Sequence, residues 1–146
     1  MALLKANRSA QWPLVASFTL NFDDTMVNVA GTTLDFGKTN AAATVVEVIN
    51  LPPGSVVTGG EWTTETAFTH AFTILVGDSG VAGRYLGSTN VGAAARTALV
   101  PTGFQNVTGL NIRLSFTNTT AGDIAGKGTL RVEYIVAGRS NEVQVQ

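Results

Sequence analysis

Apolar residues recur at every second position along much of this chain, which is the period of a β-strand with one buried face. The clearest stretch puts five apolar residues on one face of a strand: Leu14, Ala16, Phe18, Leu20 and Phe22. No segment keeps an apolar period of 3.6 residues over three helical turns. The sequence therefore predicts an all-β protein.

Turn residues divide the chain into further strands. A hairpin is expected where Ala30-Gly31 joins residues 25–29 to residues 32–36, because glycine suits a tight turn. Pro52, Pro53 and Gly54 form a corner, since proline cannot donate to a β-ladder. Strands are also expected at residues 44–50, 56–66, 69–76, 110–116 and 130–136.

Two glycine-containing segments interrupt this regular pattern. Gly59-Gly60, inside a long strand, indicates a bulge or a bend between two sheets. Residues 77–95 are rich in Gly, Ala, Ser and Asn and predict an exposed loop, with a helical turn near residues 91–95. About eight strands at spacings of roughly ten residues favour a β-sandwich, with a jelly roll as the first choice.

A chain of 146 residues has the length of a single domain. We assign residues 13–138 to the sandwich, residues 1–12 to an extended N-terminal arm and residues 139–146 to a short polar tail. The arm ends in Trp12-Pro13, which suits a segment that lies across a neighbouring molecule. Terminal segments are usually ordered only when something binds them.

Charged residues make up 13% of the chain, about half of the roughly 25% found in typical soluble domains. A surface with so few charges is expected to be covered in part by partners. A net charge of -1 argues against nucleic-acid binding through a basic patch. The chain has no cysteine, no run long enough to span a membrane and no recognisable signal peptide.

A short segment, Gly77-Asp78-Ser79-Gly80, resembles the nucleophile segment of trypsin-like serine proteases. Such a serine needs a histidine base and an orienting acid. The single histidine, His70, lies only nine positions before Ser79, and the chain is too short for that family's two barrels. The segment is therefore interpreted as a turn.

Other polar residues also lack the pattern of a catalytic or metal site. One histidine without cysteine cannot build a tetrahedral zinc site unless several carboxylates join it. The aspartates, including the adjacent Asp23-Asp24, fall at expected turns and lack the spacing of a calcium-binding loop. Glu61 and Glu65 share one strand face and are interpreted as solvated. We therefore expect no catalytic residue, metal or cofactor.

Aromatic and arginine side chains are enriched where proteins bind one another. On this ground Trp12, Trp62, Arg84 and Tyr85 are candidate interface residues. For Trp62 and Tyr85, burial in the core is an equally good interpretation. The terminal segments contribute the remaining candidates, which are Lys5, Arg8 and Arg139.

From about Trp12 to Glu142, the chain resembles the small jelly-roll cement or decoration proteins of tailed-bacteriophage capsids. Five sequence segments carry the resemblance: VINLPPG at residues 48–54, VTGGE at 57–61, VGDS at 76–79, RYL at 84–86 and VEYIVAGRSNE at 132–142.

This resemblance implies a structural protein on the outside of the virion, made in the cytoplasm of a bacterial host. It would clamp neighbouring subunits of the major capsid protein and pair as a homodimer, with a homotrimer as the alternative. It implies no catalytic residues, no cofactor and no nucleic-acid or membrane partner. The competing hypothesis is a carbohydrate- or receptor-binding jelly roll of a head fibre or tail, with Trp62 and Tyr85 stacked on sugar rings.

Overall fold

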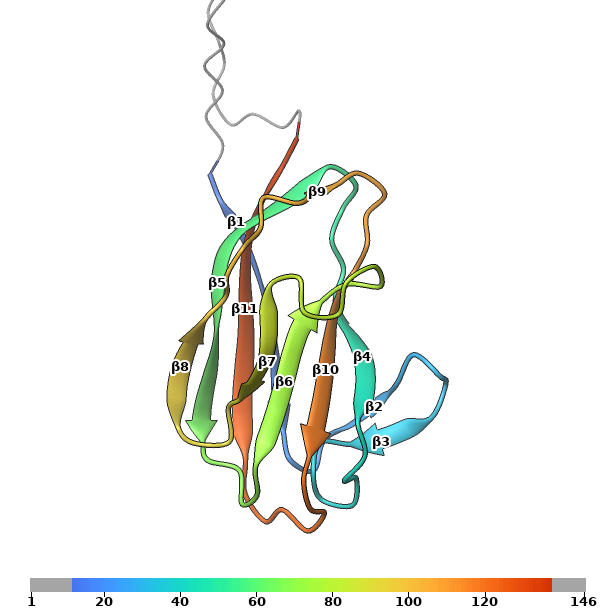
Figure 1. The fold of residues 1–146 in the computed structure, drawn as a ribbon, viewed down its shortest axis with the longest axis vertical. Coiled ribbons are helices and arrows are strands. Elements are labelled where there is room, and N and C mark those ends of the chain that lie inside the picture. The colour runs from blue at the N-terminus through green and yellow to red at the C-terminus, as the bar shows by residue number, and fades with distance from the viewer. Residues whose placement is uncertain (1–11, 138–146) are drawn as a thin grey trace, which may run out of the picture.

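The computed structural model describes residues 12–137, and every regular element in this range is a β-strand (Figure 1). No helix long and apolar enough to cross a membrane occurs in the described range. The strands are β1 Leu14–Asn21, β2 Thr25–Val27, β3 Thr33–Asp35, β4 Thr44–Ile49, β5 Ser55–Thr66, β6 Phe72–Gly77, β7 Leu86–Asn90, β8 Ala95–Ala98, β9 Gln105–Asn106, β10 Ile112–Asn118 and β11 Lys127–Val136.

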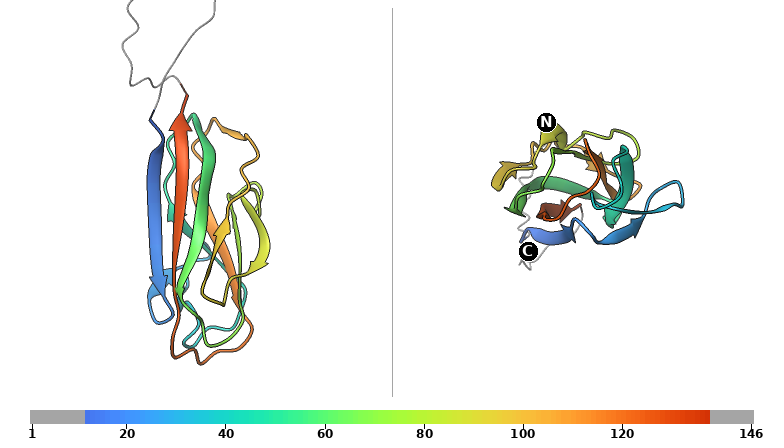
Figure 2. Two further views of the ribbon diagram at one scale, coloured as in Figure 1. Left: turned by 90° about the vertical axis from the view of Figure 1, so that its left-hand side faces the viewer. Right: turned by 90° about the horizontal axis from the view of Figure 1, so that it is seen from below.

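The strands form two antiparallel sheets that face each other (Figure 2). The larger sheet has the order β1-β11-β5-β8, and β9 also pairs with β5. The smaller sheet has the order β4-β10-β6-β7, and the β2–β3 hairpin stands apart from both. Each sheet thus takes strands from both halves of the chain, which is the strand order of a jelly roll. The predicted all-β sandwich of jelly-roll type is confirmed.

A row of aromatic rings fills the space between the sheets. The Phe36 and Phe116 ring centroids lie 4.9 Å apart, and those of Phe116 and Phe72 lie 5.6 Å apart. Phe68 stacks on Phe72 with 4.1 Å between centroids, and Trp62 closes the row at 6.4 Å from Phe72. Burying each ring stabilises the fold by about 2–3 kcal/mol. The row therefore holds the two sheets together.

The indole of Trp62 fits a space that only glycine leaves free. A Cβ atom on Gly128 of β11 would lie 2.2 Å from Cζ2 of Trp62. The indole Nε1 donates to the Thr64 hydroxyl over 2.8 Å, and that hydroxyl donates to the Val91 carbonyl over 2.6 Å. The largest core side chain is thus fully buried with its polar atom satisfied.

The bulge predicted at Gly59-Gly60 is present directly before this pair, where Thr58 is the extra residue. The pairing of β5 with β11 shifts register between Glu133, opposite Gly59, and Tyr134, opposite Val57. A Cβ on Gly60 would lie 2.2 Å from the Arg131 carbonyl oxygen, so the two backbones approach closely there. β5 remains in one sheet throughout, so the alternative of a bend between sheets is wrong.

Two sequence-based predictions about the middle of the chain are wrong. The expected loop at residues 77–95 contains β7, and the expected helical turn at residues 91–95 is irregular chain leading into β8. Both strands lie at sheet edges and are rich in small and polar residues, so they lack the apolar alternation that marks a strand. The strand expected from residue 69 begins at Phe72, because the His70 main chain donates to a side chain of another loop.

Replacing Gly128 by alanine should destabilise the protein, because the new methyl group would overlap the Trp62 ring. We expect Gly128→Ala to lower the free energy of unfolding by about 1–3 kcal/mol, measured by urea denaturation. The matched control is Gly87→Ala in β7, where an added Cβ meets no atom within 4 Å. The control should change stability by less than about 0.5 kcal/mol; equal losses in both variants would contradict this explanation.

Candidate partner-binding surface

Both ends of the described chain lie at one end of the sandwich (Figure 1). Trp12 directly precedes β1 and has 77% of its surface exposed. β1 and β11 pair antiparallel, with Leu14 opposite Tyr134, so the chain enters and leaves side by side. The other candidates in the terminal segments, which are Lys5, Arg8 and Arg139, lie outside the described residues.

Trp62 and Tyr85 are core residues, so their assignment as interface residues is corrected. Trp62 is 0% exposed and Tyr85 is 2% exposed. Burial raises the pKa of Tyr85, and the neighbouring Asp78 carboxylate raises it further. Neither ring can meet a partner while the fold is intact. The hypothesis of sugar stacking therefore loses the two residues on which it rested.

Arg84 is engaged within its own loop. Its Nε donates to Oδ2 of Asp78 over 2.5 Å, and its guanidinium lies 3.5 Å from the centroid of the Phe104 ring. Burial raises the pKa of Asp78, but hydrogen bonds from Arg84 and from the N–H groups of Val81 and Gly80 lower it more. Arg84 thus shapes the β6–β7 loop and presents only a small part of its side chain to a partner.

The protease-like segment forms a turn, as interpreted from the sequence. Its aspartate accepts the N–H groups of the following loop, and Ser79 is exposed. His70 precedes β6 and Ser79 follows it, so the strand separates the serine from the histidine. His70 instead contacts the buried carboxylate of Asp123.

The outer face of the larger sheet carries hydroxyl groups and paired charges. The Thr19 and Thr129 hydroxyl oxygens lie 2.9 Å apart, and Thr129 donates to Glu65 over 3.0 Å. Lys127 pairs with Glu65 over 2.8 Å, and its hydrogen bond, followed by that of Thr129, lowers the pKa of the Glu65 carboxyl.

The same face carries a second ion pair, between Glu61 of β5 and Arg96 of β8. The side chain of Glu61 is 22% exposed and that of Glu65 is 42% exposed. Each carboxylate has a cationic partner on a neighbouring strand. The sheet thus presents a surface that is polar and close to neutral. The charges in these two pairs already have partners, so contact through this face would leave none of them buried without a counter-charge.

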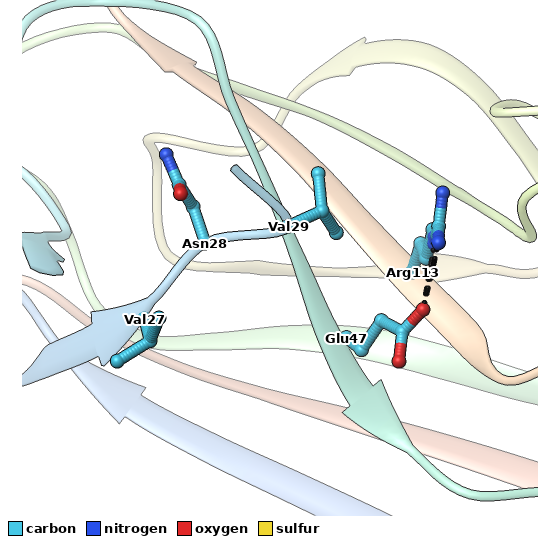
Figure 3. A pocket seen from close by; sticks show the side chains of 5 residues that line it. All are labelled: Val27, Asn28, Val29, Glu47 and Arg113. Atoms are coloured by element: carbon cyan, nitrogen blue, oxygen red, sulfur yellow. Dashed lines mark hydrogen bonds and ion pairs between the residues drawn. The ribbon is translucent and has the colours of Figure 1, made fainter. Parts of the chain in front are cut away.

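The β2–β3 hairpin projects from the side of the sandwich (Figure 1). Val27 and Val29, at 56% and 50% exposure, line an open hollow of about 250 Å³ with Asn28 between them (Figure 3). Glu47 and Arg113 complete the hollow with an ion pair of 2.8 Å, and hydrogen bonds from Arg113 and then Asn111 lower the pKa of Glu47. Sequence reasoning found the hairpin and missed its exposed valines.

Three further valines are exposed in the connections between strands. They are Val81 at 49%, Val100 at 68% and Val107 at 72%. Each stands alone in a segment rich in turn residues, so no periodic pattern in the sequence distinguishes it from a core residue. The sequence feature that could have indicated their exposure is the abundance of turn residues around them.

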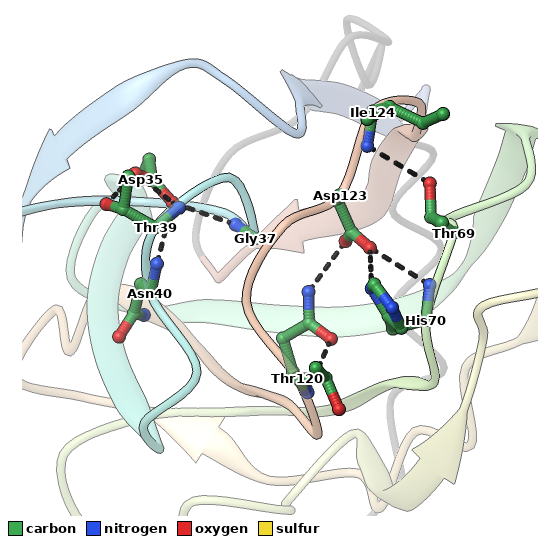
Figure 4. A network of polar contacts seen from close by, with 10 residues as sticks. Asp35, Gly37, Thr39, Asn40, Thr69, His70, Thr120, Asp123 and Ile124 are labelled. Carbon is green, nitrogen blue, oxygen red and sulfur yellow. Dashed lines mark hydrogen bonds and ion pairs between the residues drawn. The ribbon is translucent and has the colours of Figure 1, made fainter.

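A buried carboxylate ties the loops at the opposite end of the sandwich (Figure 4). The side chain of Asp123 is fully buried; it accepts the His70 N–H at 2.9 Å and lies 2.7 Å from Nδ1 of His70. Its second oxygen accepts from Asn118 Nδ2 over 2.6 Å, and its own N–H donates to the Gly37 carbonyl. Three separate connections between strands are joined in this way.

Asp35 organises the neighbouring loop by accepting several donors (Figure 4). Its carboxylate accepts the N–H groups of Gly37, Thr39 and Asn40 and the Thr39 hydroxyl. Burial raises its pKa, but these hydrogen bonds outweigh burial and lower the pKa to about 2. Within residues 12–137, no three His, Asp or Glu side chains gather to hold a metal ion.

Acid should weaken the fold through Asp35, because its folded-state pKa of about 2 lies below the ordinary 3.8. The stabilisation is complete above about pH 4 and is lost as the pH falls towards 2, a loss of about 2 kcal/mol. We expect Asp35→Asn to flatten this part of the stability curve, measured by urea unfolding at each pH. Thr39→Val, which keeps the N–H donors, should flatten it less; an unchanged curve for Asp35→Asn would exclude this role.

The fold is shared with proteins found in phage capsids. No protein-family model and no curated protein matches this sequence. One similar chain comes from the cyanophage Pam1 capsid asymmetric unit, with 22% identity, a TM-score of 0.61 and coverage of 92% of this chain and 94% of that chain. Another comes from the acidic stable capsid of Helicobacter pylori bacteriophage KHP30, with 17% identity, a TM-score of 0.54 and coverage of 92% and 100%. At these identities the similarity establishes the β-sandwich fold.

Proposed function

We propose that this protein is a structural component of a phage head that binds the outside of the shell and clamps neighbouring subunits of the major capsid protein. The observation that carries the proposal is the fold similarity to chains of two phage capsid structures over 92% of this chain. The five sequence segments that resemble capsid cement proteins support the same role. The protein would be made in the bacterial cytoplasm and would act without catalysis or a cofactor.

The surface suits such a role. Its ion pairs, such as Lys127 with Glu65 and Arg113 with Glu47, neutralise charges within the chain. Contacts with the shell would then rest on packing and hydrogen bonds. A protein that binds only the assembled shell stabilises that shell by mass action, and contacts of one copy with several subunits add avidity.

We place the main contact at the end of the sandwich where the chain begins and leaves. Trp12 is exposed there, and an exposed tryptophan is a frequent hot spot of binding. Lys5 and Arg8 precede it in the sequence and Arg139 follows β11 closely, so this end would add cations to the contact. Copies would pair as homodimers, with homotrimers as the alternative.

Binding to heads assembled without this protein tests the proposal. The purified protein should co-sediment with such heads in a saturable manner and should raise the temperature at which they release DNA. Absence of binding to expanded heads would overturn the proposal. A glycan array would then test the receptor-binding alternative directly.

Removal of residues 1–11 should weaken attachment to heads and leave the sandwich folded, because the first strand of the sandwich begins at Leu14. The measurement is the dissociation constant from co-sedimentation, with the thermal unfolding midpoint as the check on folding. Undiminished binding by the truncated, folded protein would rule out a contact through the N-terminal segment.

Trp12→Ala should weaken head binding by at least about tenfold, which corresponds to the loss of one hot-spot side chain. The matched control is Ile124→Ala, since Ile124 is 81% exposed in the β10–β11 loop at the opposite end of the sandwich. The control should bind as the unchanged protein does. Weaker binding in the control alone would reverse the proposed orientation on the shell.

A further inference from the structure

Each sheet of the sandwich has two edges, formed by β1 and by β8 with β9 in the larger sheet and by β4 and β7 in the smaller, and edge strands offer unpaired N–H and C=O groups to other chains. Three of the four edges are obstructed. β8 is only four residues long and carries the charged Arg96, and β4 is covered where the Val29 N–H donates to the Val45 carbonyl. β7 is short, contains Gly87 and shifts register against β6. These are the ordinary devices that prevent strand pairing.

Among the described residues, none of these devices protects the fourth edge, β1. Its eight residues, Leu14–Asn21, include no charge, no proline and no glycine. All eight pair with β11 in one unbroken register. Figure 2 shows β1 at the margin of the larger sheet. A long, regular and uncharged edge is the kind to which another strand adds.

The hydrogen-bonding pattern identifies the free groups on this edge. The Phe22 N–H donates to the Gly126 carbonyl, and these two residues continue the register of β1 with β11 one step beyond the pair of Asn21 and Lys127. In an antiparallel ladder, bonded and non-bonded pairs alternate. The even-numbered residues of β1 therefore bond to β11, and the odd-numbered residues direct their N–H and C=O groups away from it.

Local features limit the free edge at both ends. Pro13 has no N–H group, and the Asn21 N–H already donates to the Asp24 carboxylate over 2.7 Å. Between them, Val15, Ser17 and Thr19 retain outward-directed N–H and C=O groups. The side chains of all three residues are exposed.

We infer that β1 pairs with β1 of a second copy, antiparallel about a two-fold axis through Ser17. The inference rests on the homodimer of the proposed function and names its contact. In this register, Ser17 lies opposite Ser17 of the second copy, and Val15 lies opposite Thr19. All six free backbone groups of each copy are then bonded, because each opposed pair exchanges two hydrogen bonds.

Other registers of the same pair satisfy fewer groups. A shift of one residue would place core-facing side chains opposite solvent-facing ones. A shift of two residues would place either Thr19 opposite Pro13 or Val15 opposite Asn21, and the N–H of Pro13 is absent while that of Asn21 is occupied. The register centred on Ser17 also sets the small Ala16 opposite the large Phe18, so their volumes complement each other.

Charge at Ser17 tests this contact, because the residue faces its own copy across the axis. The unchanged protein should have the mass of a dimer in analytical ultracentrifugation. Ser17→Lys and Ser17→Glu should each be monomeric, since like charges directly opposite repel. An equimolar mixture of the two variants should recover dimers that contain one copy of each.

Ala98→Lys provides the matched control, because Ala98 is exposed on β8 at the opposite edge of the same sheet. It should remain dimeric, and thermal unfolding should show that every variant is folded. Amide hydrogen exchange should be slow at Val15, Ser17 and Thr19 in the dimer and fast in Ser17→Lys. A monomeric unchanged protein, or a dimer unaffected by Ser17→Lys and Ser17→Glu, would overturn the inference.

The failure of this inference can be distinguished from the failure of the proposed function. Monomers that bind heads would contradict the β1 contact and leave the role on the head in place. Dimers that fail to bind heads would contradict the role on the head and leave the β1 contact in place. Protection of the β1 amides only on heads, with a monomer in solution, would assign the edge to a strand of the capsid subunit and overturn the pairing of two copies.

Discussion

The fold depends on the aromatic row between the two sheets. Phe36, Phe116, Phe72 and Phe68 contact one another in sequence, and Trp62 completes the row from the larger sheet. Each ring buries a large apolar area, so the row supplies much of the energy that opposes separation of the sheets. The close approach of the backbone at positions such as residue 128 is the geometric condition for this packing.

Buried polar side chains hold the loops in place, as the aromatic rings hold the two sheets together. Asp35, Asp78 and Asp123 are each buried, and each accepts several donors from the loop around it. Ion pairs such as Lys127 with Glu65 then engage the charges that remain near the sheet surface. The result is a compact sandwich in which these charges already have partners within the chain, which favours close packing into an assembly.

Strands were predicted most accurately from the sequence where apolar and polar residues alternate most regularly. Strands whose apolar residues alternate, such as β1 and β10, were predicted close to their observed bounds. β7 and β8 were missed, because an edge strand can be built of small and polar residues when its neighbours supply the core. Of the described candidate interface residues, Trp12 is exposed, while Trp62 and Tyr85 are buried, and residue type alone does not separate these cases.

The sequence by itself determined the all-β class, the positions of most turns and the low surface charge, because these depend on residue type and local spacing. The tertiary structure decided which aromatic rings are buried, which charges are paired and which sheet edge has no strand partner among residues 12–137. Each of these depends on contacts between residues far apart in the chain, such as the pairing of β1 with β11. β1 is an edge strand because β11 pairs with one of its two sides, and no local pattern in the sequence predicts that pairing.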